Sequence, residues 1–149
     1  MKAYKVFRRV NGKLLSAVAG SHQWRSLRAR TYSEKRPTTP LKGCGPMACF
    51  SKLSSAMGFH ENSTALYYAA MEIWEVEVEE AEPQYFDNWS RLIYLWQDDA
   101  ANNGMPGCNL PGDTVLASRV KLVRRLARSE EKSCRIEWDI DVIERSHLT

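Results

Sequence analysis

Two segments of the sequence alternate between apolar and charged side chains, and this alternation constrains the fold more than any other feature. Glutamates separate apolar residues from Trp74 to Glu79, and charged residues separate apolar ones from Cys134 to Val142. A period of two is typical of a β-strand with one buried and one solvated side. Strands of this kind are found in antiparallel sheets that face water on one side. The sequence therefore predicts such a sheet.

The N-terminal segment predicts a β-hairpin. Residues 4–10 and 13–19 are β-compatible and flank Asn11-Gly12, a dipeptide suited to a two-residue type I′ turn because both positions need a positive φ. This turn sets Val6 opposite Ala17 and Arg8 opposite Leu15. The side predicted to face the core carries Tyr4, Val6, Val10, Leu15, Ala17 and Ala19.

Helical spacing is found in three places. Ser51 is a suitable N-cap for a helix that ends at Gly58, with Leu53, Ala56 and Met57 on its apolar face. A second short helix is predicted over 63–70. A third is predicted over 87–100, where Phe86, Trp89, Ile93 and Trp96 recur at intervals of three and four.

The segment 115–125 fits a helix or a strand, and we favour a strand. As a strand it can return through a hairpin loop at 127–132 to the alternating C-terminal segment. That register sets Lys121 opposite Asp139 and Arg119 opposite Asp141, and each such pair contributes roughly 0.2–1 kcal/mol.

The length of 149 residues, with 44% hydrophobic and 26% charged side chains, fits one domain spanning 1–149. We predict an α+β fold, a mostly antiparallel twisted sheet of five or six strands with one or two short helices packed on it. A domain of this size needs no disulfide or metal to hold its core. The sequence has no apolar run long enough to span a membrane and no signal-peptide core. We therefore expect a cytoplasmic protein with reduced thiols and no cofactor.

The net charge of +3 conceals a strong segregation. Residues 1–42 hold 11 basic and 1 acidic residue, whereas residues 43–113 hold 2 basic and 11 acidic ones. Such asymmetry indicates either a surface for nucleic acid or basic strands that lie beside acidic ones. The second interpretation is favoured, because most charged runs are solvated faces.

Four sets of residues together show a resemblance. They are the hairpin of 4–17, Gly43-Cys44-Gly45-Pro46 running into 48–51, Ile73–Val78, and Gly112–Ala117 followed by Val120–Arg124. In this order they resemble a family of small uncharacterised proteins often encoded by bacteriophages and related mobile elements. The resemblance implies a strand at 115–125 and a viral or mobile-element origin. It implies no catalytic residue.

The sequence offers candidate residues for four kinds of chemical site. Cys44, Cys49, Cys108 and His60 lack the paired spacing of zinc sites, and they are expected to be structural or surface residues rather than metal ligands. Cys44 is a conceivable nucleophile only if His60 or His22 lies beside it. An ADP-ribosyltransferase-like site would use Arg8, Tyr67 or Tyr68, and Glu77. A nucleotide-binding loop at 43–46 lacks the Lys-Ser/Thr of a P-loop.

The long basic loop 22–46 is the surface that we would test first. It interleaves aromatic and basic side chains, as stacking and phosphate-contacting surfaces do, and Trp, Tyr and Arg also dominate protein interface hot spots. The predicted binding surface consists of Trp24, Arg25, Arg28, Arg30, Tyr32, Lys35 and Arg36. We expect a non-enzymatic phage or mobile-element accessory protein that binds a host macromolecule, foremost a protein. Alternatives are nucleic-acid binding through 22–42 and an ADP-ribosyltransferase-like or nucleotide-binding domain.

Overall fold

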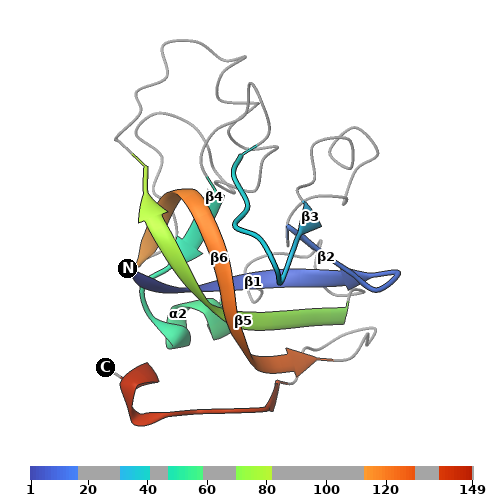
Figure 1. Ribbon diagram of the computed structural model, residues 1–149. Helices are drawn as coiled ribbons and strands as arrows, with labels where there is room; N and C mark the ends of the chain where they lie inside the picture. The colour runs from blue at the N-terminus through green and yellow to red at the C-terminus, as the bar shows by residue number, and fades with distance from the viewer. Residues whose placement is uncertain (17–30, 41–46, 59–69, 82–112, 130–137, 149) are drawn as a thin grey trace.

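The computed structural model describes residues 1–16, 31–40, 47–58, 70–81, 113–129 and 138–148 (Figure 1). These residues form a seven-stranded antiparallel sheet, one short α-helix and one turn of 3₁₀ helix. The strands are β1 (Lys2–Val10), β2 (Lys13–Ser16), β3 (Thr31–Tyr32), β4 (Met47–Phe50), β5 (Ala70–Glu80), β6 (Thr114–Ser129) and β7 (Asp139–Ile140). The helices are α2 (Leu53–Gly58) and the 3₁₀ turn η3 (Arg145–His147). The predicted mostly antiparallel sheet with a short helix is confirmed, but the sheet has seven strands where five or six were predicted.

Four strands close into a ring. β1 pairs with β5 from Lys2 to Arg9, β5 pairs with β6 along nearly its whole length, β6 pairs with β4 through its first residues, and β4 returns to β1 at the Tyr4–Phe50 pair. The β2–β3 hairpin arm extends from β1, and β7 extends from the far end of β6. The ring gives the sheet an inside and an outside.

The curvature that closes the ring is concentrated in β6. Its pairing with β5 shifts register at three places, and at each place β6 carries one residue more than β5: Ser118, Val123 and Leu126. A β-bulge of this kind bends the strand and increases its twist. Figure 1 shows β6 sweeping across the front of β5 before it turns toward the C-terminal segment.

The hairpin prediction is confirmed in its turn and register. Asn11 and Gly12 have φ values of 50° and 78°, and Arg8 lies opposite Leu15. Ala17 and Ala19 lie outside the described residues. The prediction of a single core side was wrong, because Ala3, Lys5 and Phe7 are buried on one face of β1 while Tyr4 and Val6 are buried on the other. Leu14, not Leu15, is the buried residue of β2.

Both faces of β1 are buried because apolar clusters lie on both sides of it. One cluster joins Phe7, Leu14, Tyr32 and Met47 to Val76, Val120 and neighbouring residues. The other joins Tyr4, Val6, Ile73 and Leu126 to Leu53 and Ala56 of α2. The predicted helix ending at Gly58 is thereby confirmed, with its apolar residues against the sheet.

A lysine is buried beside the first cluster. Lys5 is 1% exposed, and its Nζ donates a 2.6 Å hydrogen bond to the carbonyl oxygen of Ala48. The same ammonium lies 5.7 Å and 5.4 Å from the ring centres of Phe7 and Tyr32. Aromatic faces attract cations at such distances, so Lys5 ties β1 to β4 and to the arm.

The preference for a strand at 115–125 is confirmed, since the whole segment belongs to β6. The predicted pairing with the C-terminal segment was wrong. β7 has only two residues, and it sets Arg128 opposite Asp139, so Arg119 and Lys121 lie opposite Glu79 and Glu77 of β5 instead. The predicted hairpin loop at 127–132 also begins too early, because β6 continues to Ser129.

Steric exclusion explains why β7 does not pair with Arg119 and Lys121. Next to Arg119 and Lys121, the edge of β6 away from β5 is taken by β4 at Met47–Phe50 and by Thr38, so β7 can join β6 only at its far end. The predicted strand at 74–79 is confirmed within β5, which begins at Ala70. The helix predicted over 87–100 and residues 63–69 of the second predicted helix lie outside the described residues.

A buried ion pair joins the hairpin to β5. Glu72 is 5% exposed and accepts two hydrogen bonds from Arg9, Nε to Oε2 at 2.7 Å and Nη2 to Oε1 at 2.9 Å. The indole Nε1 of Trp74 donates to the same Oε1 at 3.0 Å. Burial alone raises the pKa of the Glu72 carboxyl, but these hydrogen bonds and the charges of Arg9 and Arg125 outweigh it and hold the pKa below its ordinary value.

We predict that Gly12→Ala lowers the free energy of unfolding by about 1 kcal/mol, because an L side chain at φ 78° is strained. No atom lies within 4 Å of an added Cβ at Gly12 or at Gly58. Gly58, whose φ is not positive, is therefore the matched control, and Gly58→Ala should change stability by less than about 0.5 kcal/mol. Urea denaturation measures both, and equal losses would contradict the turn assignment.

We predict that Glu72→Gln destabilises the protein by about 2 kcal/mol at neutral pH, because Arg9 loses a buried partner. A carboxyl whose pKa is lowered by folding stabilises the fold above its unfolded pKa, and this contribution is lost as the pH falls through the folded pKa. The wild type should therefore lose more stability than the variant between about pH 5 and about pH 2. Parallel slopes in denaturation measured across this pH range would refute the role of Glu72.

Candidate interaction surface

Residues 33–40, which we call the strap, lie across the outer edge of β6. The backbone of Thr38 exchanges two hydrogen bonds with Val120, N to O at 2.8 Å and O to N at 2.9 Å. Earlier in the strap, the hydroxyl of Ser33 accepts a hydrogen bond from the amide of Lys35 at 3.1 Å. Lys35 and Arg36 are exposed. The bridge at Thr38 therefore fixes to β6 a segment from the N-terminal half of the chain that carries exposed Glu34, Lys35 and Arg36.

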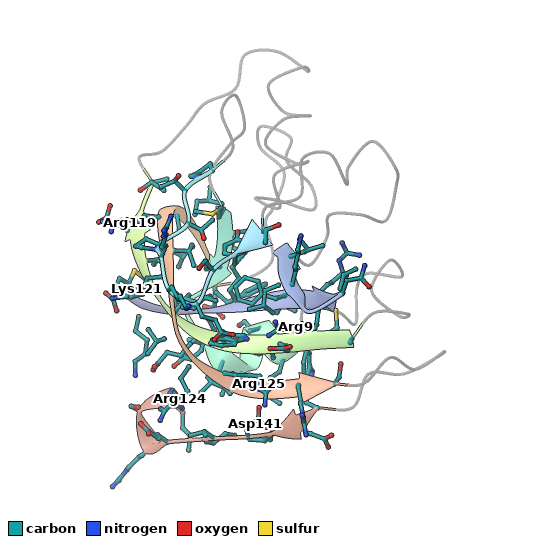
Figure 2. All side chains as sticks on the ribbon, turned by 45° about the vertical axis from the view of Figure 1, so that its right-hand side comes forward. Arg9, Arg119, Lys121, Arg124, Arg125 and Asp141 are labelled. Carbon is teal, nitrogen blue, oxygen red and sulfur yellow. The ribbon has the colours of Figure 1, made fainter. Side chains whose placement is uncertain are left out.

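The adjoining part of β6 presents two more cations. Arg119 and Lys121 are exposed on either side of buried Val120 (Figure 2). Arg119 Nη1 lies 3.4 Å from Glu79 Oε1, but both side chains are about half exposed or more, and exposed pairs of this kind contribute little. The carboxylate of Glu77, opposite Lys121, is engaged by the amino group of Met1. Lys121 itself forms no ion pair with any residue that the structure describes.

These elements enclose a groove of about 300 Å³, which we call the strap groove. Its apolar lining comes from Met1, Pro37 and Val78. Arg119 and Lys121 form a cationic wall on β6, and Glu77 and Glu79 form an anionic wall on β5. The strap groove can thus receive a group that combines an apolar side chain with a negative charge.

The residues predicted for binding from sequence are only partly described. Lys35 and Arg36 are exposed and directly precede Pro37, which lines the strap groove. Tyr32 is not a surface anchor as predicted, because it is 4% exposed and packs edge-to-face on Phe7 with ring centres 4.8 Å apart. Its burial follows from the pairing of β3 with β2, which sets Tyr32 opposite Leu14. Trp24, Arg25, Arg28 and Arg30 lie outside the described residues.

Arg119 and Lys121 were missed as surface candidates. The sequence shows that 114–132 is basic, but these two residues were assigned to ion pairs with Asp139 and Asp141. In the structure, Asp141 forms an ion pair with Arg125, with Oδ2 and Nε 2.6 Å apart, and Asp139 lies opposite Arg128. Only the correct register reveals that Arg119 and Lys121 have no acidic partner among residues 138–148 of the C-terminal segment.

The residues considered for catalysis do not gather in the described part of the chain. Arg8 lies opposite Met71 and Glu77 lies opposite Lys2, which places them six residues apart along β1, about 20 Å at 3.3 Å per residue. Tyr67 and Tyr68 lie outside the described residues. Cys49 is fully buried, and Cys44, Cys108, His22 and His60 are not described. No group of three metal-ligating side chains is found among the residues described.

A second polar cluster anchors the C-terminal segment. His147 is 3% exposed, and its Nε2 lies 3.1 Å from Oε1 of Glu75. Its Nδ1 accepts a 3.0 Å hydrogen bond from the amide of Glu144, so Nε2 carries the proton and donates to Glu75. Lys2 Nζ also lies 3.2 Å from Oε1 of Glu75, and the ring of Tyr4 meets the imidazole edge-on.

This cluster is a structural anchor rather than a catalytic dyad. Both nitrogens of His147 are committed to hydrogen bonds within the fold, and a general base needs a free nitrogen within reach of the proton that it removes. Burial raises the pKa of Glu75, but hydrogen bonds from His147 and Lys2 outweigh it and keep the pKa below its ordinary value. The ionised carboxylate therefore holds η3 against β5 and β1.

We predict that His147→Ala loosens the C-terminal segment. The amides of Asp141 and Val142 donate to the carbonyl oxygen of Leu126 at 2.7 and 3.2 Å, and their hydrogen exchange should become at least about tenfold faster once the anchor is lost. Leu148→Ala is the control, because Leu148 is 71% exposed. Unchanged exchange at both amides, measured by NMR, would show that η3 does not anchor the segment.

No family model matches the chain, and neither the curated proteins nor the solved structures include a match. No helix in the described residues is long and apolar enough to cross a membrane.

Proposed function

We propose that the protein is a non-enzymatic interaction module that binds an anionic surface of a host macromolecule through the strap and β6. The observation that carries the proposal is the backbone bridge between Thr38 and Val120. It joins the strap, which carries Lys35 and Arg36, to the part of β6 that carries Arg119 and Lys121. The resemblance to phage and mobile-element proteins supports an accessory role in the cytoplasm of a host cell.

The charge distribution of the described residues supports this choice of surface. Elsewhere on the sheet, four cations form ion pairs: Arg9 with Glu72, Lys2 with Glu75, Arg124 with Glu144 and Arg125 with Asp141. At the strap, Lys35, Arg36 and Lys121 are exposed. Arginine and lysine arrays of this kind steer an oppositely charged partner and fix its register.

An enzymatic role has less support from the described geometry. The separation of Arg8 from Glu77 along β1 does not assemble the ADP-ribosyltransferase-like set. The buried His147–Glu75 pair is used to hold η3. A binding function needs neither the ADP-ribosyltransferase-like residues nor the His147–Glu75 pair. It uses side chains that are exposed in the structure.

We predict that Lys121→Glu abolishes capture of the partner from a bacterial lysate by the immobilised full chain. Lys13→Glu is the matched control, since Lys13 is exposed at the hairpin turn and the net charge changes equally. Wild type and Lys13→Glu should capture the same species, and the amount captured should fall when the salt is raised from about 50 to about 300 mM. Capture that Lys121→Glu leaves undiminished would refute the proposed surface.

A further inference from the structure

We propose that the strap groove receives an extended, acidic segment of a partner protein, with a partner carboxylate on Arg119 and Lys121 and an adjacent apolar side chain in the groove. This inference rests on the proposed function and specifies the chemistry of the partner. It follows from the mixed walls of the groove, from its size and lining, and from the manner in which β6 already holds an acidic segment of its own chain.

The mixed walls favour a protein over a nucleic acid. Glu77 and Glu79 have side chains that are 57% and 65% exposed, and they line the groove opposite Arg119 and Lys121. A phosphate backbone carries a negative charge at every nucleotide, and these carboxylates would repel part of it. A peptide can place one carboxylate on the β6 wall and present backbone amides or a cation to the β5 wall.

The groove has the size and lining for a short stretch of peptide. A volume of about 300 Å³ is at the lower end of small-ligand sites. Pro37 and Val78 supply apolar contact on its lining. A nucleic-acid surface would instead offer aromatic side chains for stacking, and none of the described residues that line this groove is aromatic.

The C-terminal segment shows how β6 binds an acidic, extended chain. At the lower part of the strand, Asp141 pairs with Arg125 at 2.6 Å and Glu144 pairs with Arg124 at 2.8 Å. The backbone of the same segment donates to the carbonyl oxygen of Leu126. Figure 2 shows this segment running beside the lower end of β6, while Arg119 and Lys121 lie at the upper part.

The upper part of β6 repeats this chemistry without the acidic occupant. At the upper part, Thr38 forms backbone hydrogen bonds with Val120. At the lower part, the C-terminal segment forms backbone hydrogen bonds with Leu126. The strap presents two exposed cations, Lys35 and Arg36, and one exposed carboxylate, Glu34. The charge of Glu34 helps to raise the pKa of Arg9 on β1, and Glu34 is not among the described residues that line the groove. A partner segment would therefore supply a carboxylate to Arg119 and Lys121 that the strap does not.

The test uses fluorescence polarisation of three labelled probes of equal length, about 12 residues or nucleotides, with the full chain. The probes are a peptide of alternating glutamate and valine, the same peptide with glutamine in place of glutamate, and oligothymidylate. The glutamate peptide should bind at least about tenfold more tightly than the other two. Tighter binding of oligothymidylate, or equal binding of the glutamine peptide, would overturn the proposed partner chemistry.

Variants then locate the peptide. Lys121→Gln and Arg119→Gln, which keep most of the side-chain length, should each weaken binding of the glutamate peptide by about fivefold or more, whereas Lys13→Gln should leave it within about twofold. Unfolding curves of the variants confirm that the fold is retained. Binding of the glutamate peptide that is insensitive to Lys121→Gln and Arg119→Gln would place it elsewhere and overturn the inference.

The two proposals fail differently. If Lys121→Glu abolishes lysate capture and nuclease treatment of the lysate abolishes it as well, the interaction surface stands and the acidic protein segment is refuted in favour of nucleic acid. If lysate capture does not depend on Lys121, the proposed function itself is refuted. Nuclease-resistant capture that depends on Lys121 and is displaced by the glutamate peptide supports both proposals.

Discussion

The fold depends on the double pairing of β6. This strand must lie antiparallel to β5 along its length and also meet β4 at its first residues, and a flat strand cannot satisfy both partners. The extra residues at Ser118, Val123 and Leu126 bend it enough to do so. Once the ring is closed, β1 has apolar clusters on both faces, and α2 and the C-terminal segment cover the outer one.

The ring also resolves the charge segregation of the sequence. Basic β1 lies beside acidic β5, and β5 lies beside basic β6, so four of the five glutamates of β5 lie opposite a cation of β6: Glu72, Glu75, Glu77 and Glu79. Glu72 uses Arg9, and Glu75 uses Lys2 together with neutral His147. Much of the segregated charge is thereby paired inside one sheet, as the sequence favoured. The exposed cations at the strap are what this pairing leaves over.

Local signals in the sequence predicted local structure well. Asn11-Gly12 determined the hairpin register, the glutamate alternation identified β5, and the apolar spacing after Ser51 identified α2. The failures concern contacts between distant segments. Tyr32 was expected at the surface because its neighbours in sequence are basic, but pairing with Leu14 turns it onto Phe7. The two buried faces of β1 and the partners of Arg119 likewise depend on ring closure, which no single segment encodes.

The candidate surface is a non-local feature for the same reason. Lys35 and Arg36 could be chosen from the sequence because they lie in a basic run, whereas Lys121 resembles any cation on a half-exposed strand. The strap that carries Lys35 and Arg36 is joined to the strand that carries Lys121 by two backbone hydrogen bonds at Thr38, a residue with no distinguishing sequence signal. Thr38 can reach β6 there because the pairing of β6 with β4 ends at Ala117 and its pairing with β7 begins only at Ala127. The lengths of β4 and β7 therefore determine which cations of β6 remain open to a partner.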